Sequence, residues 1–526
     1  MPLGRMARED GLTSTTAHTA PHTTSTAKRW TLVATIVASS MTFIDGTVIN
    51  VALPALQHGM NATIAQVQWV IEAYALFLGS LLLVGGSLGD QIGRKRVFMI
   101  GVAIFTLASA ACGLAPTPLF LISARAIQGI GAAFLVPGSL SIISSTFEGA
   151  KRGRAIGTWS GFSAITTAAG PVAGGWLVEH ASWRTVFFIN VPLAALVMFL
   201  SVRYVPESKD PSRGRSIDWA GALLGVVGLS GIVLGLLEWP SRGAGDRLVL
   251  LSLASGVVFL AALIVVEART SDPMLPLAPF RVRAFTLSNL LTLFLYAALA
   301  EVMFMMPLLL IEVRGFSATA AGASLLPFPI IMFALSRWSG GLVARVGSKL
   351  PLTIGPAVTG AGFALLAMLG RLGSSSVLVV PAVVIMGLGM ALTVAPLTTT
   401  VMSSLPSMHS GVASGVNNAV SRVAGLIAIA AFGVVIASVF NNRVTARLAS
   451  VSMSQTERAT LGRELPKMAA ANVKGIASMS GDARRAVRRA IDDSFGGAFQ
   501  IAMLGSAALA FAAALVGVMI PSRARG

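Results

Sequence analysis

The chain has 526 residues, of which 55% are hydrophobic and only 11% are charged, and its formal net charge is +18. Soluble domains carry about 25% charged residues, so this composition excludes an ordinary soluble protein. Runs of 18 or more apolar residues recur along the chain and predict a protein that crosses a membrane many times. The bases lie in short clusters between these runs, as cytoplasmic loops would, and no region outside them is large enough for a nucleic-acid-binding domain.

The first 29 residues, rich in Thr, Ser and Ala, are predicted to be a disordered cytoplasmic tail. A signal peptide is the competing interpretation, because Lys28 and Arg29 precede an apolar stretch. That stretch runs from Trp30 to about Leu53, whereas the apolar region of a signal peptide has about 7–15 residues. We therefore interpret it as an uncleaved first span.

Fourteen apolar segments are predicted to be transmembrane helices, or thirteen or twelve if the two between 217 and 267 do not both cross. The predicted spans are 30–53, 67–88, 97–115, 118–139, 155–178, 184–204, 217–238, 247–267, 284–310, 318–344, 351–370, 375–400, 410–439 and 497–520. An even number places both termini on one side, and the basic connections, such as 151–154, make that side cytoplasmic. The 441–494 segment then falls outside, although it carries ten bases against five acids.

A short motif is repeated. GSLGDQIGRK begins at Gly86, and GGLVARVGSK begins at Gly340. The two copies have the first Gly, the Leu, the later Gly and the Lys at the same positions. Each copy follows the second span of a six-span set. The prediction is an all-α membrane protein with two related six-helix halves, a known transporter architecture. The expected division is a tail over 1–29, an N-terminal half over 30–204, two inserted helices over 205–283, a C-terminal half over 284–520 that includes the 441–494 loop, and a cytoplasmic tail over 521–526.

Five motifs carry a family resemblance. They are IDGTVINVALP from Ile44, GSLGDQIGRK from Gly86, RAIQGIGAA from Arg125, GPVAGG from Gly170 and WRTVFFINVP from Trp183. As an ordered set, they resemble the signatures of the major facilitator superfamily, in particular its fourteen-span drug:proton antiporters (QacA- and EmrB-like exporters). Two positions depart from the expected pattern: Thr166 in the fifth span, and Ala344 where the first-half loop has Asp90.

The Gly86–Lys95 segment is predicted to be a gating loop. Gly86 and Gly93 let two helix ends approach closely, because glycine lacks a Cβ. Asp90, with Arg94 and Lys95 nearby, can form a charge-assisted latch to a neighbouring helix that closes in one state and releases in another. The alternative is a plain positively charged loop that only sets the orientation of the chain.

Ionisable residues within spans are costly and are functional candidates. Asp45, Glu72, Arg125 and Glu301 are all predicted to lie in the outer half of the bilayer, from the rise of 1.5 Å per residue. A carboxylate in a partly dry cavity can bind and release a proton near neutral pH, so Asp45 is the predicted coupling residue, and the resemblance implies roles for Asp45 and Arg125. Glu72 is a second titrating acid, a counter-charge for a cationic substrate, or an interfacial residue.

The predicted substrate cavity lies in the C-terminal half. Glu301 is followed by flexible methionines, including Met305, which suit a pocket for varied apolar shapes. Asn417 and Arg422 form a polar stripe on the span from 410. The alternative for Glu301 is a packing residue paired with Arg337 or Arg422.

The predicted helix bend lies in the fifth span. Gly170, Pro171, Gly174 and Gly175 should bend this helix and pack it tightly against a partner from the other half. In similar sequences this bend keeps the cavity from leaking protons.

The expected function is export of hydrophobic, possibly cationic, drugs by proton-coupled antiport in the plasma (inner) membrane. Protons and a small molecule are the expected partners, no cofactor, metal or nucleic acid is expected, and a monomer is expected. One alternative is export of a single endogenous metabolite or antibiotic. A non-transporting sensor is a second alternative, which the intramembrane Asp45 and the loop residues Asp90 and Arg94 do not favour. An integral-membrane enzyme is a third, which the few histidines, three of them in the tail or first outer loop, do not favour; the single cysteine, Cys112, allows no intramolecular disulfide and suggests no Cys-based metal site.

Overall fold

A computed structural model describes residues 25–209, 218–270, 273–370, 376–405, 410–476 and 478–521. The elements in these ranges are all helices. Residues 1–24 of the tail predicted over 1–29, residues 522–526 of the tail predicted over 521–526, and the side chain of Arg337 lie outside what is described. Residues 25–29 belong to a helix, so the predicted end of the first tail is wrong.

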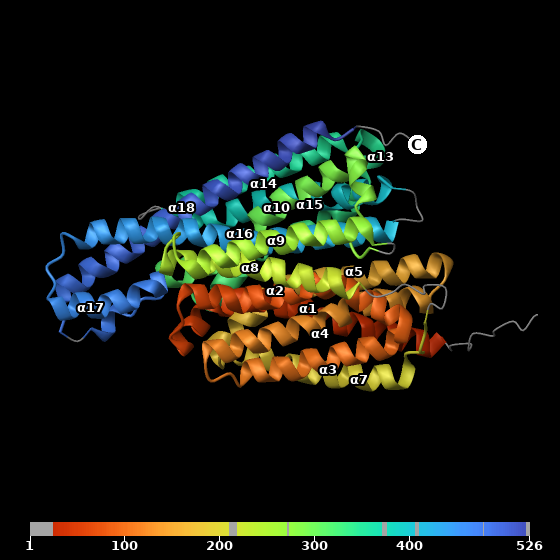
Figure 1. Ribbon diagram of the computed structural model, residues 1–526, viewed down its shortest axis with the longest axis horizontal. Coiled ribbons are helices and arrows are strands. Elements are labelled where there is room, and N and C mark those ends of the chain that lie inside the picture. The colour runs from red at the N-terminus through yellow and green to blue at the C-terminus, as the bar shows by residue number, and fades with distance from the viewer. Residues whose placement is uncertain are drawn as a thin grey trace, which may run out of the picture.

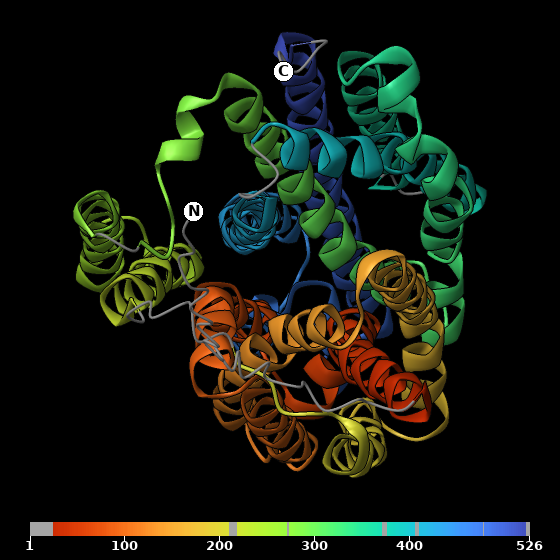
Figure 2. The same cartoon turned by 90° about the vertical axis from the view of Figure 1, so that its right-hand side faces the viewer.

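The N half consists of seven helices: α1 (Ser25–Met60), α2 (Ile64–Ile92), α3 (Arg94–Gly113), α4 (Pro118–Thr146), α5 (Gly149–His180), the single turn α6 (Thr185–Phe188) and α7 (Asn190–Tyr204). Two inserted helices follow, α8 (Trp219–Arg242) and α9 (Arg247–Arg269). α8 packs against α2 and α16 at the seam between the halves, and α9 packs on α8, as Figure 2 shows at the side of the bundle.

The C half begins after η1 (Ala278–Arg281). Its elements are α10 (Arg283–Leu308), η2 (Leu309–Val313), α11 (Ala318–Ser324), α12 (Pro327–Gly340), α13 (Leu342–Val346), α14 (Lys349–Ala367), η3 (Met368–Gly370), η4 (Ser376–Leu378), α15 (Val379–Ser403), α16 (Ser410–Leu448), α17 (Gln455–Glu464), η6 (Leu465–Ala470), η7 (Val473–Gly475) and α18 (Gly481–Met519).

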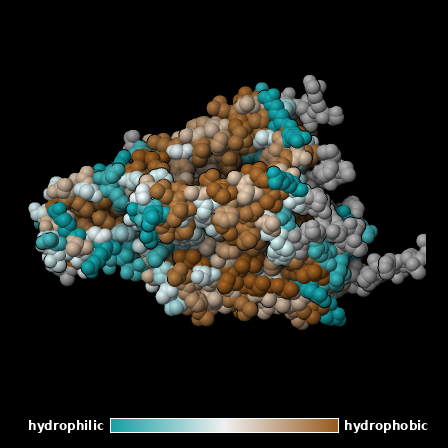
Figure 3. All heavy atoms as spheres, in the orientation of Figure 1, coloured by the Kyte–Doolittle hydropathy of each residue, from teal (hydrophilic) through white to brown (hydrophobic). Residues whose placement is uncertain are grey.

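The number of spans agrees with the prediction. Thirteen of the described helical segments are long and apolar enough to cross a membrane. α5 has 32 residues and packs along α1, and it makes the fourteenth. Its many Gly, Ser and Thr residues lower its hydropathy below that of the others. The face of the molecule shown in Figure 3 is largely apolar across its middle and carries more polar residues toward both ends. Together with the number of apolar helices, this makes the chain a multi-pass membrane protein.

Three predicted boundaries are wrong. The single span expected over 318–344 is divided into α11, α12 and α13, because the chain turns at Leu325 before Pro327, and proline starts a helix more readily than it continues one. The span over 410–439 continues to Leu448. The span over 497–520 begins at Gly481, where the Ser480 side chain accepts a hydrogen bond from the Ala483 amide and caps the helix.

Much of the predicted 441–494 loop is therefore helical. α16 and α18 continue beyond the other helices along the long axis of the molecule, and the segment between them carries α17 (Figure 1). We call residues 449–480 the cap. Its interior is packed, because Met468, Ala469 and Val473 are buried. The basic stretch 484–493 is part of α18, so it continues the long helix beyond the apolar part of the molecule.

The described chain starts and ends at the side opposite the cap, which we call the terminal end. Thr31 near the start of α1 bonds to the Tyr204 carbonyl at the end of α7, and Ser348 bonds to the carbonyl of Pro521. Figure 1 places the end of α18 on the side of the molecule away from α17.

The two halves are joined near the cap end. The largest buried apolar cluster continues from Leu53 and Val67 of the N half to Met306 and Leu309 of the C half. Hydrogen bonds and ion pairs between the halves lie at this end, namely Gln57 to the Lys467 carbonyl, Gln68 to the Ile429 carbonyl, His58 with Glu312, Thr319 to Glu179 and Lys467 to Asn61. This conformation is therefore closed at the cap end.

Candidate functional site

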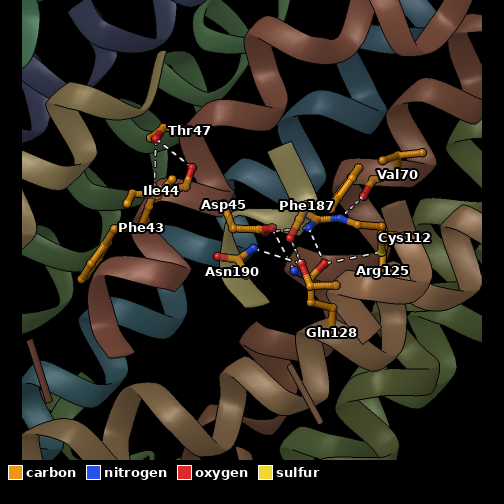
Figure 4. A network of polar contacts seen from close by, with 11 residues as sticks. Phe43, Ile44, Asp45, Thr47, Val70, Cys112, Arg125, Gln128, Phe187 and Asn190 are labelled. Atoms are coloured by element: carbon orange, nitrogen blue, oxygen red, sulfur yellow. Dashed lines mark hydrogen bonds and ion pairs between the residues drawn. The ribbon is translucent and has the colours of Figure 1, made fainter. Parts of the chain in front are cut away.

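The centre of the N half holds a buried ion pair. Asp45 on α1 is 3% exposed and Arg125 on α4 is 1% exposed. The Arg125 Nη1 lies 2.6 Å from Asp45 Oδ2 (Figure 4). Removing one partner of such a pair costs about 3–5 kcal/mol, because the other charge is left uncompensated. The structure brings together these two residues, which the sequence analysis had named as candidates.

Gln128 completes this pair, and the sequence analysis missed it. Its Oε1 accepts a hydrogen bond from Arg125 Nη1 at 2.7 Å, and its Nε2 donates to Asp45 Oδ1 at 2.8 Å. The signal was present in RAIQGIGAA, because residues three apart on a helix share one face. Cys112 contributes a weak Sγ–H donor to the same Oε1 at 3.7 Å.

α2 holds the other side of the Arg125 guanidinium. Its Nε donates to the Val70 carbonyl at 3.0 Å, and its Cζ lies 4.3 Å from the centre of the Tyr74 ring. Gly129 of α4 allows α2 to come this close to Arg125, because a Cβ at that position would lie within 3 Å of the Tyr74 carbonyl oxygen. Arg125 thus keeps partners of its own even when Asp45 changes its charge.

If the chain performs the export expected from its sequence, Gln128→Leu should lower the rate of that export and shift its pH profile, because Asp45 and Arg125 each lose a hydrogen bond in a buried site. Each unsatisfied buried group costs about 1–3 kcal/mol. The measurement is transport by the full chain in vesicles as a function of pH. The matched control is Gln455→Leu in the exposed first turn of α17, and an unchanged profile in Gln128→Leu would show that this side chain does not position the pair.

Open space lies beside the pair. Gly46 follows Asp45 in α1 and is exposed, and no atom lies within 4 Å of the position that a Cβ there would occupy. The carboxylate is enclosed, while the next residue along the helix is accessible.

Glu72 and Glu301 are also buried, but they have no partner. Both are 0% exposed, and neither oxygen of either carboxylate has a hydrogen-bond partner in the described structure. An interfacial position for Glu72 is therefore excluded in this conformation. The predicted alternative that Glu301 pairs with Arg422 is wrong here, since Glu301 accepts no bond.

The remaining predicted cavity residues lie on or beside α16. Asn417 donates to the side chains of Asn289 and Thr292 on α10, at 3.2 and 2.7 Å, so it joins two helices of the same half. Arg422 is partly buried and faces Gly79 of α2. Met305 of α10 is packed in the core in this conformation.

The predicted gating loop has a defined ion pair. Asp90 Oδ1 accepts from Nε and Nη2 of Arg94 at 2.9 and 2.8 Å, within the loop itself. Gly93 has φ 129°, a conformation that favours glycine. Gly86 lies in α2 with Pro137 of α4 as its neighbour.

Glu207 is a second residue that the sequence analysis missed. Its carboxylate accepts from the backbone amides of Lys95 and Arg96 at the start of α3 and fills the space where a Cβ at Gly93 would lie. The Lys95 side chain donates to the Val202 carbonyl. The glycine and charge pattern thus ties the loop to the segment after α7, in addition to any role in gating.

The glycines of α5 serve two helix contacts. Gly170 and Gly174 face Thr47 and Val48 of α1, in the same half. Gly175 faces the backbone of Ala318 and Thr319 in α11 of the other half. Pro171 meets α11 as well, because a Cβ at Gly322 would lie within 3 Å of its carbonyl oxygen. The structure therefore places these four residues where α5 contacts both halves.

The described chain forms two helical bundles, and the N-terminal bundle holds a buried intramembrane ion pair. This architecture is that of a membrane transporter. Residues 35–429 match the family model of the Major Facilitator Superfamily. The chain belongs to this superfamily, and it is a transporter, not an enzyme.

Relatives in the same superfamily are resistance and export proteins. The multidrug resistance protein Stp of Mycobacterium tuberculosis is 35% identical over 409 residues, which cover 78% of this chain and 76% of Stp. The tetracenomycin C resistance and export protein of Streptomyces glaucescens is 32% identical and covers 84% of this chain and 80% of its own length. The puromycin resistance protein of Streptomyces alboniger is 34% identical, with 76% and 80% covered.

Solved structures agree on the fold. A bacterial homologue of the human lysosomal transporter Spinster, in an inward-facing and unoccupied conformation, has a TM-score of 0.62 at 17% identity, with 94% of this chain and 99% of that chain covered. A peptide transporter of the POT type has a TM-score of 0.60 at 13% identity, with 94% and 96% covered.

Proposed function

We propose that this protein exports hydrophobic, often cationic, small molecules in exchange for protons, and that Asp45 carries the coupled proton. The observation that supports this most directly is the buried Asp45–Arg125–Gln128 cluster, with accessible space beside it at Gly46. A buried carboxylate beside a cation is stable when ionised, and it can accept a proton when the cation withdraws.

The partners of Arg125 support a two-state exchange. In this conformation Asp45 pairs with Arg125. When a proton neutralises Asp45, Arg125 still has the Val70 carbonyl, Gln128 Oε1 and the face of Tyr74. The guanidinium then stays satisfied, while α1 loses an electrostatic contact with α4 and is free to shift.

The halves supply the movement. We propose that residues 30–204 and 284–520 rock against one another about the central cavity, with 205–283 inserted between them. The cap-end contacts close one face, so this conformation would be open toward the terminal end. The glycine contacts between α5 and α11 are the seam at which the cap end would part and close again.

The bases of the terminal end support the orientation. Arg96, Lys151, Arg152 and Arg154 are exposed there, and such clusters favour the cytoplasmic side. We propose a location in the plasma (inner) membrane as a monomer, with both termini in the cytoplasm and the cap outside.

A second candidate is the export of one endogenous antibiotic. Several relatives are named for a single compound, such as tetracenomycin C or puromycin. A narrow substrate and a broad one would use the same proton site, so the two proposals differ only in the cavity.

The experiment is to record proton movement in energised inverted vesicles while lipophilic cations and neutral antibiotics are added. Proton release from the vesicles on addition of several chemically different compounds would support broad export. Proton release on addition of one antibiotic class alone would support the second candidate. If the full chain transported compounds at an unchanged rate after the proton gradient was collapsed, this result would contradict proton coupling.

A further inference from the structure

Glu72 and Glu301 come from opposite halves, and the contacts among α2, α10 and α16 bring them to the same depth. Along α2, the Gln68 side chain donates to the Ile429 carbonyl of α16 at 3.2 Å. Three turns later, a Cβ at Gly79 would lie 3.6 Å from the Cβ of Arg422 on α16. α2 and α16 therefore run antiparallel in contact, and Glu72, one turn after Gln68, lies on the stretch of α2 that faces α16 between these two points.

α10 meets the same stretch of α16, because Gly425, which contacts α10, lies one turn before Ile429 on nearly the same face of α16. A Cβ at Gly425 would lie 3.2 Å from the side chain of Ala300, the residue before Glu301. Glu301 thus lies level with the middle of the α2–α16 contact. The two carboxylates are near enough that their charges would repel one another if both were ionised.

A small cavity one turn nearer the cap confirms this placement. Gln68 lies four residues before Glu72, and Phe304 and Met305 lie three and four residues after Glu301. All three line one cavity together with Gly433, and the remaining lining residues are Ile64, Ile436, Met468 and Phe495. α2 and α10 therefore lie beside each other against α16 at this depth.

No positive charge compensates the two carboxylates. Within the membrane-spanning part of the helices packed around them, the described ionisable groups are Asp45 and Arg125, which pair with each other, and Arg422, Tyr74, Tyr296 and Cys112. None of these donates a hydrogen bond to Glu72 or Glu301. An enclosed site without donors accommodates neutral carboxyl groups, and two ionised ones would be strongly unfavourable.

We propose that Glu72 and Glu301 form a second proton-binding site that spans the two halves and holds the cap end closed while it is protonated. Loss of the protons would place two like charges in one enclosed interface, and separation of the halves at the cap end would relieve this repulsion by admitting water. The site takes protons and not the exported molecule, because it is fully enclosed. This inference rests on the proposed proton coupling and adds to it a second site, distinct from Asp45.

The test measures the opening of the cap end against pH. Spin labels on Pro116→Cys, in the exposed link between α3 and α4, and on Arg463→Cys, at the exposed end of α17, report the separation of the halves. The full chain is reconstituted in lipid nanodiscs, and the distance is followed as the pH is raised. We expect wild type to change from a short to a long distance, with a steepness that indicates two coupled protons.

The variants separate the roles of the two acids. Glu72→Gln/Glu301→Gln imitates the protonated pair and should keep the short distance at every pH, and each single variant should show the less steep transition of one proton. Glu238→Gln is the matched control, because this acid pairs with Arg242 at the end of α8, away from the site, and it should behave as wild type.

Three results would overturn the proposal. The first is a double variant that opens with pH like wild type, and the second is a wild type that does not respond to pH. The third is closure by sodium at fixed pH in wild type but not in the double variant, which would assign a metal cation to the site in place of protons. Asp45→Asn separates this failure from that of the proposed function: it should lose proton-driven export and keep the response of the cap end to pH.

Discussion

Asp45→Asn is expected to abolish proton-driven export. Asparagine has nearly the shape of aspartate, so α1 can keep its packing, but the amide cannot bind and release a proton at any working pH. Arg125 would then lie permanently beside a neutral group, with the Val70 carbonyl and Gln128 as its remaining acceptors. The measurement is accumulation of a lipophilic cation in energised inverted vesicles, where the rate should fall to that of vesicles without the protein.

The loss should concern coupling and not the whole transport cycle. Exchange of labelled for unlabelled substrate across the membrane, without a proton gradient, should continue in Asp45→Asn. Asp493→Asn is the control, because that carboxylate pairs with Arg447 outside the core of the bundle. Export driven by the proton gradient at the wild-type rate in Asp45→Asn would move the coupling role to another group.

Gly175→Val is expected to cause the second large loss. Gly175 lies against the backbone of Ala318 and Thr319, and a Cβ there would come within 3 Å of both residues. Backbone cannot move aside as a flexible side chain does, so α5 and α11 would be forced apart at the cap end. Overpacking of a close contact costs about 1–3 kcal/mol and sometimes more, which is enough to disfavour the closed state and slow the cycle by about tenfold or more.

Gly161→Val in the same helix is the matched control. Nothing lies within 4 Å of a Cβ at Gly161, so the same side chain should be accommodated there. Both variants replace glycine by valine in the interior of α5, so they share the change in helix propensity. Export rates and the amount of folded protein in the membrane are compared for the two. Equal rates would show that the contact between α5 and α11 does not limit transport.

Much of the architecture could be predicted because it depends on local properties. Apolar runs of sufficient length indicate membrane helices wherever they occur, and the five motifs identify the superfamily by residue order alone. The predicted boundaries failed where capping and proline decided them, as at Ser480 and Pro327. The 449–480 segment was predicted only as part of an outer loop, because its residues have little net hydropathy and their burial comes from packing between two long helices.

The candidate site could be predicted only in part. The cost of an intramembrane charge is a property of the residue and its span, so the sequence alone determined that Asp45, Glu72, Arg125 and Glu301 needed an explanation. Their partners depend on helix rotation and on contacts between segments far apart in the chain. Only the tertiary structure decided that Asp45 pairs directly with Arg125, with Gln128 bonded to both. It also decided that Glu72 and Glu301, 229 residues apart in the sequence, are buried without a hydrogen-bond partner in the described part of the chain.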